Sequence, residues 1–143
     1  MGQPTEPERR LANVTPMQLT SANADTAPTP SGGYVQAVAV NRATRLLFIS
    51  GQIPETRDGT VPAGFEAQAR LVWANLLDQL AAGGMGVANL VKVTTFLASR
   101  DHAEENSRIR QEVLAGHAVA LTVIVTGIFD ERWLLEIEAV AAA

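Results

Sequence analysis

The segment AVALTVIV, residues 118–125, decides the fold, because Thr122 is its only polar residue. Successive side chains of a β-strand point to opposite faces of a sheet. A strand that is apolar at nearly every position is therefore expected to be buried on both faces. We predict a strand over Ala118–Thr126, and the fold must supply a cover for each of its two faces.

The rest of the chain predicts two helices and four further strands. Apolar residues recur at helical spacing over Phe65–Ala82, and two glycines follow. A second helix is expected from Asp101, with Glu104 completing a capping box, to about Ala115. The other strands are expected at Val35–Val40, Arg45–Ser50, Leu90–Ala98 and Trp133–Val140. The first two of these flank the short polar segment 41–44 and read as an antiparallel hairpin.

The element order is thus ββαβαββ, which predicts an α+β fold with a single sheet and both helices on one face. Two helices can cover only one face of a sheet. The other face of residues 118–125 needs a different cover, and a second copy of the chain is the simplest one. Residues 1–33 hold most of the 7 prolines and are expected to be a partly irregular extension, with one domain over 34–143.

Composition excludes several kinds of function. The chain has no cysteine, which excludes disulfides, thiolate zinc sites and a cysteine nucleophile. Its net charge of −4 argues against nucleic-acid binding. His102 and His117 have no second ligand at a metal-binding spacing, so neither a metal nor another cofactor is expected. The sequence shows no signal peptide and no apolar run that could span a membrane, so a cytoplasmic protein is expected.

A set of short segments in a fixed order carries a family resemblance. They are GYVQAV (33–38), LLFISGQIP (46–54), VKVTTFL (91–97), Asn106 and EIEAVA (136–141). Together they resemble the reactive-intermediate deaminase superfamily, also called RidA or YjgF. The resemblance implies a chorismate-mutase-like fold, a homotrimer, and small-molecule sites at the subunit boundaries. The active members hydrolyse 2-imino acids and release ammonia and a 2-keto acid.

Glu136 is the candidate catalytic residue. It shares one face of the last predicted strand with Leu134 and Glu138, while the alternate residues are apolar. The resemblance implies that Glu136 positions or activates a water molecule. A carboxylate in a partly apolar cleft has a raised pKa, which suits acid–base work. The alternative is that Glu136 is simply solvated.

Four positions are candidates for binding substrate. Ser50 and Gly51 stand where a strand ends, so either their polar groups meet a ligand or the glycine only serves the turn. Asn106 falls on the helix face that should be buried, where an amide needs partners. It either bridges neighbouring backbone or belongs to the site. Tyr34 matches a family tyrosine at the rim of the pocket.

The fifth binding candidate is Leu121, which stands where the resemblance implies an arginine. In the active deaminases an arginine lies fifteen residues before the first glutamate of the closing motif, and here that position is Leu121. An arginine binds a carboxylate through two charge-assisted hydrogen bonds, which leucine cannot do. Arg108 or Arg110 from the second helix is the alternative source of that charge.

These residues lead to three hypotheses about function. The first is a pocket at trimer interfaces that hydrolyses an imine or enamine lacking a carboxylate, unlike a typical 2-imino-acid deaminase. The alternative is a non-catalytic trimer that binds a metabolite or regulates. The third, an endoribonuclease or translation inhibitor, is attached to the family name and is disfavoured by the acidic charge.

Overall fold

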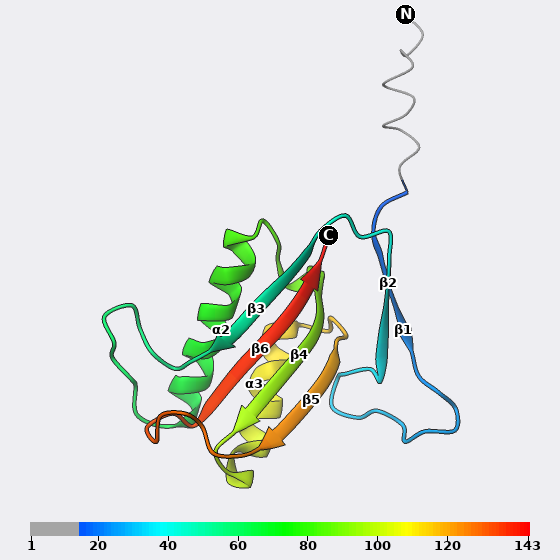
Figure 1. The fold of residues 1–143 in the computed structure, drawn as a ribbon. Helices are drawn as coiled ribbons and strands as arrows, with labels where there is room; N and C mark the ends of the chain where they lie inside the picture. The colour runs from blue at the N-terminus through cyan, green and yellow to red at the C-terminus, as the bar shows by residue number, and fades with distance from the viewer. Residues whose placement is uncertain (1–14) are drawn as a thin grey trace, which may run out of the picture.

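A computed structural model describes residues 15–143 and shows a four-stranded sheet with two helices on one face and a separate two-stranded sheet (Figure 1). In chain order the elements are β1 (Gln18–Ala22), β2 (Ala37–Asn41), β3 (Leu46–Gln52), α2 (Phe65–Ala82), η1 (Val87–Asn89), β4 (Leu90–Leu97), η2 (Arg100–His102), α3 (Ala103–Leu114), β5 (Ala120–Val125) and β6 (Leu135–Ala142). The α+β class predicted from the sequence is confirmed.

The main sheet has the strand order β3-β6-β4-β5, so β3 and β5 form its two edges. Strands β4 and β5 are parallel, while β6 is antiparallel to both β3 and β4. A parallel pair needs a long crossover connection, and α3 provides it. The last strand of the chain therefore lies inside the sheet, between strands that precede it.

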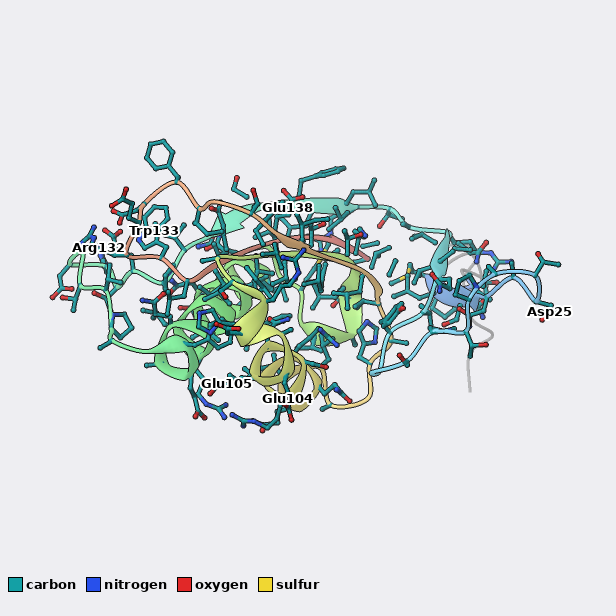
Figure 2. All side chains as sticks on the ribbon, turned by 90° about the horizontal axis from the view of Figure 1, so that it is seen from below. Asp25, Glu104, Glu105, Arg132, Trp133 and Glu138 are labelled. Carbon is teal, nitrogen blue, oxygen red and sulfur yellow. The ribbon has the colours of Figure 1, made fainter. Side chains whose placement is uncertain are left out.

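The core lies between this sheet and the helices. One stripe of α2 is fully buried, as the apolar spacing predicts, and it consists of Phe65, Ala69, Val72, Trp73, Leu76 and Leu80. Leu135 and Ile137 of β6 are also fully buried, while Glu138 is exposed. Figure 2 shows Glu138 on the side of the sheet away from the helices and Glu104 and Glu105 on the outer surface of α3.

The helix-free face of the sheet carries exposed apolar side chains. Phe48 of β3 is 74% exposed and Leu46 57%. Ile124 of β5 is 45% exposed and lies in register with Phe96, which in turn pairs with Glu136. The helices thus cover only one face, as the sequence predicts. That a second copy of the chain covers the other face remains a prediction.

The predicted hairpin between Val35–Val40 and Arg45–Ser50 is wrong, and so is the single sheet. Both strands exist, but β2 pairs with β1 instead of β3. The chain after Asn41 crosses the end of the main sheet, where the N–H groups of Thr44 and Arg45 donate to the Ala143 carbonyl (2.7 and 2.9 Å). These long-range hydrogen bonds replace the local turn.

Strand β1 was not predicted, because its sequence QLTSA lacks the apolar alternation of a half-buried strand. It falls within the expected extension 1–33, whose first fourteen residues lie outside the described part.

The predicted capping box at Asp101 is absent. Instead, the Ser99 hydroxyl accepts from the Asp101 N–H (3.1 Å) and α3 begins only at Ala103. Neither helix within residues 15–143 is long and apolar enough to cross a bilayer.

Candidate functional site

Glu136 and Gly51 lie against each other on the helix-free face. Strand β3 has a register irregularity between Ile49 and Gln52 where it pairs with β6, and Gly51 stands within it. A Cβ atom on Gly51 would overlap the Glu136 carboxylate and lie 2.8 Å from its Cδ. The absence of a side chain at position 51 therefore makes room for the carboxylate. The sequence singled out both residues but not their contact.

The surroundings of Glu136 favour its neutral form. Burial raises the pKa of Glu136, and the nearby charge of Glu138 raises it further. The side chain lines a pocket of about 380 Å³ together with Phe96, Phe129, Glu138 and the backbone turn 126–128. Phe129 is 95% exposed in the single chain. Glu136 thus has a partly desolvated carboxyl whose raised pKa would suit acid–base chemistry.

Ser50 opens onto a neighbouring pocket on the same face. This pocket has a volume of about 320 Å³ and includes Phe48, Lys92, Thr94 and Glu138 in its lining. The Lys92 ammonium donates to the hydroxyl of Thr122 on the adjacent strand. Lys92 and Thr94 fall within the segment VKVTTFL, but neither is among the site residues predicted from the sequence. Their signal was the alternation of β4, where buried Val93 lies between them.

Leu121 lies on the opposite side of the sheet. It is in register with buried Val93 and packs against the core. Asn106 of α3 is 2% exposed, and its Oδ1 atom has no hydrogen-bond partner within residues 15–143. Tyr34 adjoins the start of β5, because the next residue, Val35, bridges Ala120. Tyr34 lines a pocket there of about 300 Å³.

The six predicted site residues therefore form two groups in one chain. Ser50, Gly51 and Glu136 lie on the helix-free face, and we call them the carboxylate group. Tyr34, Asn106 and Leu121 lie at the β5 edge or on the α3 side, and we call them the edge group. The thickness of the sheet separates Glu136 from Leu121 within one chain.

The two arginines of α3 have different surroundings. Arg108 is exposed and pairs with Glu112 (2.9 Å) and, at longer range, with Glu66 and Glu105. Arg110 is 4% exposed, and its Nη2 donates to the Gly32 carbonyl (3.0 Å) and the Ser107 hydroxyl (3.1 Å).

No carboxylate lies within ion-pair distance of Arg110 in the part of the chain that the structure describes. Burial lowers the pKa of Arg110, and the nearby Tyr34 partly counters this effect. Of the two arginines, Arg110 is thus the one beside the edge group.

Both histidines have structural partners. The His102 ring stacks on Phe65 with 4.4 Å between ring centroids. His117 Nε2 lies 2.7 Å from the Leu90 carbonyl oxygen, which can only accept, so this nitrogen carries the proton. Across residues 15–143, no three His, Asp or Glu side chains converge as a metal site would require.

Comparison with known proteins identifies the family. Residues 24–143 match the family model described as endoribonuclease L-PSP. The chain is 31% identical over 125 residues to protein HMF1 of Saccharomyces cerevisiae, covering 87% of this chain and 95% of that one. A RutC family protein of Pyrococcus horikoshii is 30% identical over 119 residues, covering 82% and 92%.

Solved structures agree with these relatives. A protein of unknown function of the conserved Rid family, YyfB from Yersinia pestis, superposes with a TM-score of 0.78 at 26% identity, covering 87% of this chain and 98% of that one. Yeast Mmf1 superposes with a TM-score of 0.65 at 28% identity and the same coverage. The chain therefore belongs to the endoribonuclease L-PSP family, within the RidA/YjgF superfamily that its motifs resemble.

The contact between Gly51 and Glu136 predicts that substitutions at the two positions are coupled. Gly51→Ala is expected to lower the free energy of unfolding by about 1–3 kcal/mol, because the added methyl group displaces the carboxylate. In a Glu136→Ala background the same change should cost at least about 1 kcal/mol less. Urea denaturation of the four proteins measures this difference. Additive effects would show that the two residues do not touch.

The raised pKa of Glu136 predicts a pH dependence. Because the folded state disfavours the charged form, the contribution of Glu136 to stability is present at low pH and is lost as the pH rises through its folded pKa. Glu138→Gln should lower the pKa of Glu136 but leave it above 4.5, since burial remains. Carbon-detected NMR titration of the Glu136 carboxyl measures both values, with Glu104→Gln as the distant control. A pKa of 4.5 or below in the unchanged protein would show that the site does not disfavour the charged carboxylate.

Proposed function

We propose that this protein is a homotrimer with a small-molecule pocket at each subunit boundary, where it hydrolyses an imine or enamine that lacks a carboxylate. The proposal is carried by two observations: Glu136 is partly buried with a raised pKa, and Leu121 stands at the position where the resemblance implies an arginine. The acid–base group is present, and the carboxylate anchor is missing. The proposed location is the cytoplasm, as the composition suggests.

The separation of the two residue groups supports a site built from two copies. The carboxylate group lies on the helix-free face, which exposes Phe48 and Ile124. Exposed apolar patches of this kind mark contact surfaces. If that face meets the β5 edge of a neighbouring copy, Glu136 of one subunit approaches the edge group of the other. A pocket at the boundary would then be lined by Ser50, Gly51 and Glu136 of one subunit and by Tyr34 and Leu121 of the other, while Asn106 stays buried.

The proposed reaction needs only a water molecule and Glu136, and an enamine substrate enters it as its imine tautomer. The carboxylate takes a proton from water while the water oxygen attacks the imine carbon, and the π electrons of the C=N bond move to nitrogen. Glu136 then returns the proton to nitrogen, which gives a carbinolamine. In the next step Glu136 takes the carbinolamine hydroxyl proton and passes it to nitrogen, the O–H electron pair forms the C=O bond, and the C–N bond breaks with its electron pair leaving on nitrogen. Ammonia or an amine leaves, and a carbonyl compound remains. A carboxyl with a raised pKa suits each of these proton transfers.

The substrate class follows from the edge group. Leu121 contributes no charge and packs against the core. Arg110 is buried and already donates to Gly32 and Ser107. A ligand there would meet the partly exposed side chains of Leu121 and Tyr34, while Asn106 is only 2% exposed. We therefore propose a neutral or apolar substrate.

The alternative is a non-catalytic trimer that binds a metabolite or regulates. The missing arginine favours it as well, because loss of substrate positioning removes much of an enzyme's rate. An endoribonuclease or translation inhibitor fits least. Lys92 shares its pocket on the helix-free face with Glu138, and the net charge is −4, whereas RNA binding needs a basic surface.

Imine hydrolysis provides the test of substrate class. With imines generated by an amino-acid oxidase, the protein should give little acceleration, since no arginine holds the carboxylate. With a carboxylate-free imine from an amine oxidase it should accelerate hydrolysis, and Glu136→Gln should lose about 10²–10⁴ of that effect. Carbonyl product trapped as a semicarbazone is the readout, and Leu121→Arg is the matched variant expected to shift preference toward the carboxylate. Rapid turnover of 2-imino acids by the unchanged protein would contradict the proposal. Ligand binding without turnover of either imine would favour the alternative.

The proposed assembly is tested by a charge on the helix-free face. Ile124 is 45% exposed in the single chain, so Ile124→Asp would cost a monomer little. If subunits cover this face, the unpaired carboxylate costs several kcal/mol and the oligomer dissociates. Sedimentation and melting temperature report the outcome. Gln79→Glu, which adds a charge on an exposed position of α2, is the control and should change neither. If Ile124→Asp leaves the sedimentation and the melting temperature of the protein unchanged, no subunit covers the helix-free face.

A further inference from the structure

Within residues 15–143, strand β3 has one unpaired edge. It forms hydrogen bonds to β6 on one side only, because it is the terminal strand of the sheet. Such an edge presents a row of unpaired N–H and C=O groups and readily accepts another strand. Phe48 is 74% exposed next to this edge. The edge therefore has both the backbone groups and the apolar surface that an added strand would use.

The β1–β2 pair lacks a core of its own. Most of its residues are exposed, and no residue of either strand is fully buried. It stands beyond β5, away from β3 (Figure 1). Its link to the main sheet is at Val35, whose N–H donates to the Val119 carbonyl (3.0 Å). A two-stranded ribbon is marginally stable by itself, so this one requires a further packing partner.

The sequence between β2 and β3 favours a hairpin that a single chain does not form. Two β-rich runs flank a short polar segment, which is the local pattern of antiparallel pairing. In the structure, Thr44 and Arg45 are fixed to Ala143 at the end of β6, and β2 leads to the opposite edge of the sheet. The local pattern predicts that β2 pairs with β3. In the structure β2 pairs with β1 and does not pair with β3 of the same chain.

We propose that β2 of one copy pairs with the free edge of β3 in another copy, so that the β1–β2 pair is exchanged between subunits. Exchange of an identical element satisfies the same local pairing preference across two chains. The occupant of the β3 edge is thus a second copy of this chain. It supplies an antiparallel strand whose own outer side is already paired with β1.

The exchange also places residues of the proposed pocket. If β2 and β3 pair as they would around a turn of residues 42–45, Asn41 lies opposite Leu46, and Val35 lies opposite Gln52. Tyr34 then reaches the partner's carboxylate group while remaining beside β5 of its own chain. Strand exchange thereby joins the two residue groups. This consequence rests on the proposed function, whereas the exchange itself does not.

Engineered cysteines test the exchange without any ligand or activity, because the chain has no cysteine of its own. In the expected register, Ala39 lies opposite Phe48, and Ala37 lies opposite Ser50. Chains carrying Ala39→Cys with Phe48→Cys, or Ala37→Cys with Ser50→Cys, should oxidise to covalent multimers on a non-reducing gel. Singly substituted Ala39→Cys and Phe48→Cys chains refolded together should give a linked dimer that neither forms alone.

The control is a pair inside the β1–β2 ribbon. Thr20 and Ala39 are register partners, so Thr20→Cys with Ala39→Cys should form a disulfide within one chain. If either β2–β3 pair closes within a single chain, the hairpin is local and the proposal is overturned. If the control oxidises and neither β2–β3 pair does, β2 does not pair with β3 of any copy, which also overturns it. Neither result bears on imine hydrolysis, which is measured separately.

Discussion

The alternation of side chains along β6 is the constraint on which the rest of the structure depends. This strand pairs with both β3 and β4, so its inward residues must fill the core beneath the sheet. Leu135 and Ile137 do so, and both are fully buried. The same geometry sends Glu136 and Glu138 to the opposite face. One strand therefore determines the core under the helices and the chemistry on the surface that they leave open.

That surface has a carboxyl but lacks a complete site. Glu136 lies over Gly51, and its pKa is raised by burial and by Glu138. Ser50 and Gly51 lie beside it, whereas the other candidate substrate-binding residues, Tyr34, Asn106 and Leu121, lie at the β5 edge or on the α3 side of the sheet. A mixed sheet with helices on only one face keeps these groups apart within a chain and can bring them together between chains. If the site forms only between chains, the proposed chemistry of this protein depends on its assembly.

Much of the fold could be predicted from the sequence because its signals are local. The buried stripe of α2 and the alternation of β4 and β6 follow from spacing alone. The path after Asn41 could not be predicted, since it depends on hydrogen bonds from Thr44 and Arg45 to a residue nearly a hundred positions away. The contact of Gly51 with Glu136 arises from a strand irregularity that periodicity does not reveal. The side on which Leu121 lies likewise depends on its register with Val93.

The central place of β6 also bears on how the polypeptide folds as it is made. Strands β3 and β4 leave the ribosome before β6 and have no direct pairing with each other. Until β6 emerges, both keep open edges, and α2 has no continuous sheet on which to bury Trp73 and Leu76. Non-local pairing of this kind is slow and leaves apolar surface exposed meanwhile. The nascent chain is therefore expected to expose open strand edges and apolar side chains until β6 is inserted.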